Sequence, residues 1–78
     1  MNSLVLKYIL TIAEEKNMTR AAERLYISQP SLSQSLKNLE KELGVDLFER
    51  SRQGVVLTPA GEHYVEWAKQ ILFAEAMM

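Results

Sequence analysis

The chain has 78 residues, enough for one small domain and too few for a second independent core. Apolar residues make up 47% and charged residues 24%, a balance typical of a folded domain rather than a disordered tail. We expect a cytoplasmic protein with no membrane contact, because no apolar run approaches the roughly 18 residues of a membrane span and no secretory signal begins the chain. There is no cysteine and His63 is the only histidine, so the sequence predicts no metal site, no cofactor and no enzyme.

Charge distribution is more informative than net charge. The formal net charge is -1, which gives no sign of a polyanionic partner. Seven of the nine basic residues nevertheless lie between Lys16 and Arg52, whereas Glu62, Glu66 and Glu75 lie near the C-terminus. The middle of the chain is therefore the candidate surface for a polyanionic partner.

The spacing of apolar residues predicts a first helix over residues 2–16. Leu6, Ile9, Ile12 and Ala13 recur at intervals of three and four, as on one face of an amphipathic helix. A second apolar strip consists of Leu4, Val5 and Tyr8. Either the core is generously apolar here, or this strip meets another element or another subunit.

Capping residues then predict two more helices joined by a short turn. Asn17 or Thr19 can cap a second helix that ends at about Leu25. Ser28 offers the next N-cap, and the third helix ends at about Leu43, before Gly44.

The third helix has two contrasting faces. One face predicts a buried stripe: Leu32, Leu36, Leu39 and Leu43. The opposite face carries hydroxyls, amides and cations: Pro30, Ser31, Ser33, Gln34, Lys37, Asn38 and Lys41. Such a polar face is either merely solvated or a binding surface.

A hairpin and a long helix complete the chain. Residues 46–50 and 55–57 are expected to be two short strands around a basic tip at 51–54. Thr58 and Pro59 begin a helix that runs to residue 78. This helix carries two apolar strips, one made of Tyr64, Trp67, Ala68 and Ile71 and the other of Val65, Leu72 and Ala76. Together they present more apolar surface than a small core can bury, so the sequence implies a partner.

Two helices joined by a short turn, the second polar outward, are typical of a helix-turn-helix whose second helix enters the DNA major groove. Gln29, Ser31, Ser33 and Gln34 can form hydrogen bonds with base edges. Phosphate contacts are predicted for five cations: Arg20, Lys37, Lys41, Arg50 and Arg52. The alternative for each cation is an ordinary solvated charge that contacts no DNA. This alternative is the stronger one for Lys16, Arg24 and Lys41, because Glu23, Glu40 and Glu42 are close enough for ion pairing along the helix.

At this point the chain resembles a known family. Five motifs in order are similar to those of the DNA-binding domain of LysR-type transcriptional regulators: Thr19 to Leu25, Ser28 to Ser33, Leu39 to Val45, Leu47 to Arg50 and Leu57 to Gly61. The resemblance implies a mostly α fold, a winged helix-turn-helix with a three-helix core and a two-stranded wing, followed by a long linker helix. The domain would span residues 1–58, with the helix-turn-helix at about 18–37 and the wing at about 46–57, and the linker helix would span residues 59–78.

The resemblance also implies roles for individual residues. Those facing bases would be Gln29, Pro30, Ser31, Ser33 and Gln34, and those holding phosphate or forming the wing would be Thr19, Arg20, Ser28, Lys37, Arg50, Arg52 and Gln53. A homodimer would form through the linker helix by way of Tyr64, Val65, Trp67, Ala68, Ile71, Leu72 and Glu75. The chain departs from the family at Gln34 and Asn38, where arginines are common, and weaker nonspecific binding should follow.

The implied function is sequence-specific binding of double-stranded operator DNA by a dimer on an interrupted inverted repeat. Family members continue into a larger domain that binds a small-molecule effector, so the resemblance implies that this chain is a fragment and that the effector site lies outside it. Any tetramer would belong to the full-length protein, and the sequence does not say whether dimers pair further. Two alternative functions do not involve DNA. A helical protein-interaction module would leave the polar face of the third helix solvated, and an enzyme would need a base beside Ser28, Ser31 or Ser33, where none is expected. Glu14 and Glu15 should point to different faces, which gives no acid pair.

Overall fold

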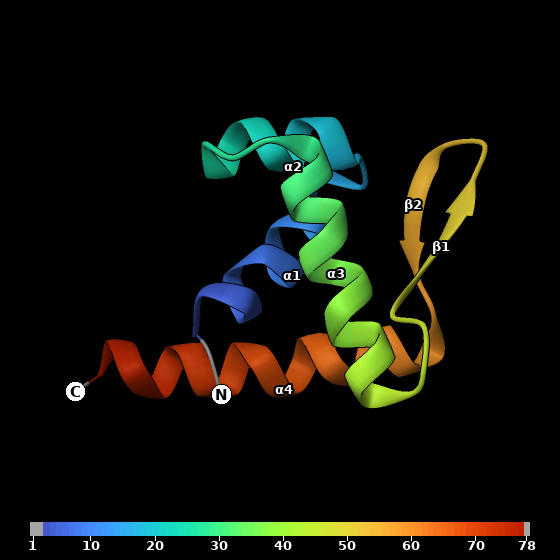
Figure 1. The fold of residues 1–78 in the computed structure, drawn as a ribbon. Helices are drawn as coiled ribbons and strands as arrows, with labels where there is room; N and C mark the ends of the chain where they lie inside the picture. The colour runs from blue at the N-terminus through green and yellow to red at the C-terminus, as the bar shows by residue number, and fades with distance from the viewer. Residues whose placement is uncertain (1–2, 78) are drawn as a thin grey trace.

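The computed structural model describes residues 3–77, which form four helices and one β-hairpin (Figure 1). The elements in chain order are α1 Ser3–Glu15, α2 Met18–Leu25, α3 Gln29–Leu43, β1 Phe48–Ser51, β2 Gly54–Leu57 and α4 Pro59–Ala76. Figure 1 shows α4 along one side of the molecule, with the α2–α3 junction and the hairpin tip both at the opposite end. The predicted winged helix-turn-helix with a long fourth helix is confirmed.

Side-chain caps set the helix boundaries where the sequence indicates them. The Asn17 Oδ1 atom accepts from the Arg20 N–H at 2.9 Å, so Asn17 rather than Thr19 is the N-cap of α2. Ser28 and Thr58 cap α3 and α4 in the same way, each followed by proline at the second or first position of its helix. Gly44 ends α3 with φ of 74°, the left-handed conformation that glycine adopts without strain.

The core gathers around α1, which contacts each of the other helices. Its predicted stripe of Leu6, Ile9 and Ile12 is almost completely buried. On α3 the prediction holds for Leu32 and Leu36, with Leu39 half-buried against the core. It is wrong for Leu43, which is 44% exposed because the last turn of α3 borders an open groove rather than the core.

The wing is a two-stranded antiparallel sheet fixed to the helical body at both ends. Its register pairs Phe48 with Leu57 and Ser51 with Gly54, so β1 begins two residues later than predicted and Arg52 and Gln53 form the tip. The Glu40 carboxylate accepts from the N–H groups of Leu47 (2.6 Å) and Phe48 (3.3 Å) at the base of the wing.

Near the tip, the Val55 N–H donates to the carbonyl of Lys16, in the corner between α1 and α2, at 3.1 Å. Gly54 lies against the same carbonyl with φ of 119°. A side chain at Gly54 would collide with it, because a Cβ atom there would lie 2.1 Å from the Lys16 oxygen. The wing is thus held at a fixed distance from the first two helices.

Candidate nucleic-acid interface

The N-terminal end of α3 lies at the end of the molecule away from α4, where it joins the turn that follows α2 (Figure 1). Ser28, Pro30, Ser31 and Gln34 are exposed, and Gln29 and Ser33 are half-buried. All five residues predicted to face bases are therefore at least partly exposed in the first turns of α3. We call this set, Gln29, Pro30, Ser31, Ser33 and Gln34, the reading surface.

Hydrogen bonds within α3 order the polar side chains of the reading surface. The Gln29 Nε2 atom donates to Ser33 Oγ at 2.8 Å, and Gln34 Nε2 donates to Asn38 Oδ1 at 2.9 Å. The Ser28 hydroxyl donates to Ser31 Oγ at 2.8 Å and accepts from the Ser31 N–H as the helix cap. Side chains already held in one arrangement lose less conformational entropy when they bind a ligand.

Exposed polar and basic residues flank the reading surface. Those predicted to contact phosphate are all exposed: Thr19, Arg20, Ser28, Lys37, Arg50, Arg52 and Gln53. They come from α2, from α3 and its N-cap, and from the wing. At the wing tip the Gln53 N–H donates to Ser51 Oγ at 3.2 Å, which orders the turn that carries Arg52.

Arg24 is neutralised within the fold, although not by the predicted neighbours. Its Nη1 atom lies 2.6 Å from Glu14 Oε1 and 3.2 Å from Glu15 Oε2, both on α1, rather than pairing with Glu23. These bonds, that with Glu14 above all, raise the pKa of the guanidinium further. Glu14 and Glu15, which are expected to point to different faces of α1, both reach this one cation on α2. Glu40 likewise serves the base of the wing as a hydrogen-bond acceptor.

Two features of this region are not predicted from the sequence: the exposure of Tyr26 and the pairing of Asn38 with Gln34. Tyr26 is 94% exposed in the turn before α3, in a left-handed conformation with φ of 58°. Its position in the turn between two capped helices is the one sequence signal for this exposure, since Tyr26 belongs to no periodic apolar stripe. Asn38 is predicted on the polar face of the third helix, but its hydrogen bond with Gln34 is not, although i, i+4 is the spacing at which helical side chains interact.

The residues predicted for dimerisation divide into two groups. Tyr64, Val65 and Ala68 are buried in the protomer's own core, so the first half of α4 belongs to the same core as residues before 59. These three residues come from both apolar strips of α4, so each strip is partly buried within the protomer, where α4 contacts α1. Four members stay accessible to a second molecule: Trp67, Ile71, Leu72 and Glu75.

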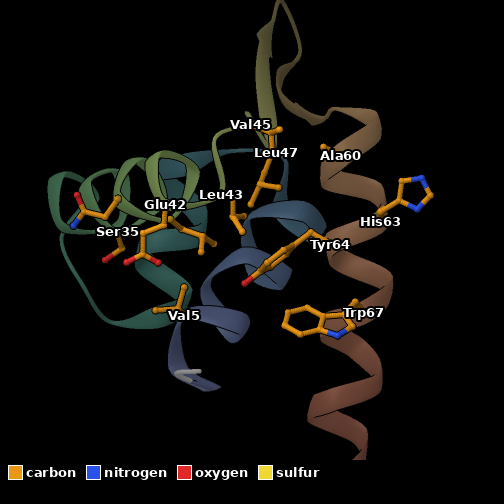
Figure 2. Close-up of a pocket in the computed structure, with 12 residues that line it drawn as sticks. Val5, Ser35, Glu42, Leu43, Val45, Leu47, Ala60, His63, Tyr64 and Trp67 are labelled. Carbon is orange, nitrogen blue, oxygen red and sulfur yellow. The ribbon is translucent and has the colours of Figure 1, made fainter.

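Trp67 stands at the mouth of an apolar groove of about 910 Å³ between α3 and α4. Leu39, Leu43 and Val45 line one side of the groove, and Tyr64 and Trp67 line the other. Figure 2 shows Tyr64 and Trp67 pointing from α4 toward α1, and His63 pointing away from them. The two rings meet edge to face, with centroids 5.6 Å apart.

Other kinds of site receive no support from residues 3–77. Within that range no three His, Cys, Asp or Glu side chains are grouped so that they could hold a metal ion. None of the helices described is long and apolar enough to cross a membrane. The reading surface and its surrounding cations are the most distinctive polar feature of the described chain.

Comparison with known proteins agrees with this geometry. The family described as bacterial regulatory helix-turn-helix protein, lysR family, matches residues 5–62, which include α2, α3 and the whole wing. The chain belongs to the LysR family. It is the winged helix-turn-helix DNA-binding domain of that family, and its fold and the family named from its motifs are both confirmed.

Individual members of the LysR family are similar over most of the chain. The HTH-type transcriptional regulator YcgK of Bacillus subtilis (strain 168) is 49% identical over 72 residues, which are 92% of this chain and 22% of YcgK. The chain therefore spans about a fifth of the length of that relative. A crystal structure of a CbnR_DBD–DNA complex has a TM-score of 0.91 at 43% identity, covering 99% of this chain and 88% of that one. A crystal structure of a BenM_DBD/benA site 1 DNA complex has a TM-score of 0.94 at 38% identity, covering 100% and 91%.

Proposed function

We propose that this LysR-family domain binds double-stranded DNA sequence-specifically as part of a transcriptional regulator, with α3 in the major groove, and performs no catalysis. The observation that carries this proposal is the exposed, hydrogen-bonded reading surface at the free end of α3. Its amides and hydroxyls supply the donors and acceptors that base edges require. The similar CbnR and BenM domains, each solved with DNA, support the same use of the fold.

The surrounding cations supply affinity without sequence choice. Arg20 and Lys37 flank the reading surface on the helices, and Arg50 and Arg52 lie on the wing. Each phosphate that a cation neutralises releases counterions from the duplex, so binding weakens as salt rises. Because Arg24 is engaged by two carboxylates, it is not counted among these contacts.

We also propose a homodimer that pairs the exposed part of α4 antiparallel with its counterpart. Trp67 is 40% exposed near the middle of α4, and Ile71 and Leu72 follow it toward the C-terminus. The 18 residues of α4 extend over about 27 Å, a suitable spacer for two recognition helices that must reach major grooves about 34 Å apart. Such a dimer would bind an interrupted inverted repeat.

The test measures affinity for a selected duplex and for a random duplex over a range of salt concentrations. Gln29→Ala should cost about 1 to 3 kcal/mol of discrimination at one base position. Arg52→Ala should weaken binding to all sequences alike and reduce the salt slope by about one unit. Lys69→Ala is the matched control for the cation, since Lys69 is exposed on α4 beside Glu66 and should leave both quantities unchanged.

Two results would contradict the proposal. Equal losses on selected and random duplexes for Gln29→Ala would remove it from base recognition. Binding to neither duplex at low salt would favour a protein-interaction module, which has no reason to bind DNA in a salt-dependent way.

A further inference from the structure

One hydrogen bond on α3 bears on which base pair the domain prefers. Gln34 and Asn38 are both exposed on the outer face of α3, one helical turn apart. The Gln34 Nε2 atom donates to Asn38 Oδ1 at 2.9 Å. This bond occupies one of the two Nε2 protons of Gln34 and fixes which side of its amide turns toward Asn38.

The atoms that remain free on Gln34 form a mixed pattern. Its Oε1 atom can accept a hydrogen bond and its second Nε2 proton can be donated. In the major groove adenine presents an acceptor at N7 beside a donor at N6, whereas guanine presents acceptors at both N7 and O6. One donor beside one acceptor matches adenine, and against guanine the Oε1 atom would face another acceptor.

We propose that Gln34 selects an A·T base pair and that Asn38 is a positioning residue that holds the Gln34 amide in the orientation that reads adenine. The inference rests on the proposed function, because it requires α3 in the major groove. It also gives a role to Asn38, whose own Nδ2 protons stay free for a neighbouring base or phosphate.

The contrast with Gln29 explains why the second glutamine carries this selectivity. Gln29 is half-buried and its Nε2 atom donates to a hydroxyl, which can itself turn and donate elsewhere. Gln34 is exposed, and its partner oxygen belongs to an amide, which cannot reverse its role without rotating the whole group. Its orientation is therefore the better defined of the two.

The experiment is selection from a library of randomised duplexes with the 78-residue chain, followed by fluorescence anisotropy on the selected duplex and its single-pair variants. For the wild type we expect one base pair at which A·T is preferred over G·C by about tenfold. Gln34→Ala should abolish the preference at that pair alone, and Gln34→Arg should change it to G·C. Gln70→Ala, a glutamine change at an exposed position of α4, is the matched control and should retain the preference.

Asn38 is tested by two variants that separate positioning from charge. Asn38→Ala should reduce the A·T preference about threefold while leaving the salt slope unchanged, because asparagine is neutral. Asn38→Asp keeps an oxygen that can accept from Gln34, so it should retain the preference while lowering affinity for all duplexes through its negative charge. Circular dichroism of each variant checks that α3 still forms.

The outcomes are distinguishable. A wild-type preference for G·C at the pair that Gln34→Ala affects, or full discrimination in Asn38→Ala, would overturn this inference and leave the proposed function intact. Discrimination lost equally in Asn38→Ala and Asn38→Asp would overturn the positioning role. Failure of the wild type to bind any duplex would overturn both the inference and the proposed function.

Discussion

Gly61 offers the most demanding test of the packing between α4 and the base of the wing. It lies in the first turn of α4, where its N–H donates to Thr58 Oγ1 at 3.0 Å. A Cβ atom at Gly61 would lie 2.0 Å from the Leu47 carbonyl oxygen, whereas ordinary contact begins at 3.4 Å. Gly61→Ala therefore requires two backbone segments to move apart by about 1.4 Å.

The expected change in stability combines three effects of opposite sign. Alanine is favoured over glycine in a helix by up to about 1 kcal/mol. Forcing extra volume into a packed site costs about 1 to 3 kcal/mol. The displacement also threatens the hydrogen bond from the Thr58 N–H to Leu47 O, now 3.0 Å, at a cost of about 1 kcal/mol. The sum is a destabilisation of about 2 kcal/mol, or a fall in Tm of about 8 to 16 °C for a domain of this size.

Urea unfolding followed by circular dichroism measures this change, and several protein concentrations separate folding from association. Gly44→Ala is the matched control, because a Cβ atom there meets nothing within 4 Å and suffers only from the positive φ of 74°. We expect that control to cost about 1 kcal/mol. If Gly61→Ala instead stabilises the domain, helix propensity outweighs the contact and the packing described here is wrong.

Three further predictions concern the wing and the groove. Gly54→Ala should displace the wing tip from the Lys16 carbonyl. DNA titrations should then show weaker binding to every duplex and a smaller dependence of affinity on salt. Unchanged binding would mean that the wing makes no contact with DNA. Glu40→Ala removes the acceptor shared by the N–H groups of Leu47 and Phe48, and urea unfolding should show a loss of stability of about 1 to 3 kcal/mol. Glu42→Ala, at an exposed position, is the control and should change stability by no more than about 0.5 kcal/mol. Equal losses in the two variants would refute the acceptor role of Glu40. The Tyr64 hydroxyl is buried and has no hydrogen-bond partner among residues 3–77, so Tyr64→Phe should leave stability equal or higher by up to about 1 kcal/mol at pH 8. Burial raises the pKa of Tyr64, so above about pH 10 the unfolded chain loses this proton first and wild-type stability falls, a loss that the variant should lack; an identical difference at pH 8 and pH 11 would contradict the burial argument.

Local chemistry made the element boundaries predictable from the sequence. Ser28, Gly44 and Thr58 act through atoms only a few residues away, so their effect does not depend on the rest of the fold. The accessible end of α3 followed from the same caps and from the alternation of its two faces. The motif series identified the family because it extends over nearly the whole domain.

Features that depend on tertiary contact were not predictable in this way. Periodicity showed two apolar strips on α4, but not that folding would bury Val65 and Ala68 in the protomer's core and leave Trp67 accessible. Sequence distance suggested Glu23 as the partner of Arg24, whereas the crossing of α1 and α2 supplies Glu14 and Glu15. Gly54 and Gly61 each lie against a backbone carbonyl that is far away in the chain. The sequence shows that a residue is glycine, but not which distant residue packs against it.

The Val55–Lys16 hydrogen bond has a mechanical consequence for DNA recognition. Because it ties the sheet to the bend between α1 and α2, the span from the wing arginines to the tip of α3 is set before any duplex arrives. Because the protein does not change this span on binding, the duplex has to deform until its groove width matches it. Stretches of sequence that no side chain touches can then be accepted or refused according to how easily they deform.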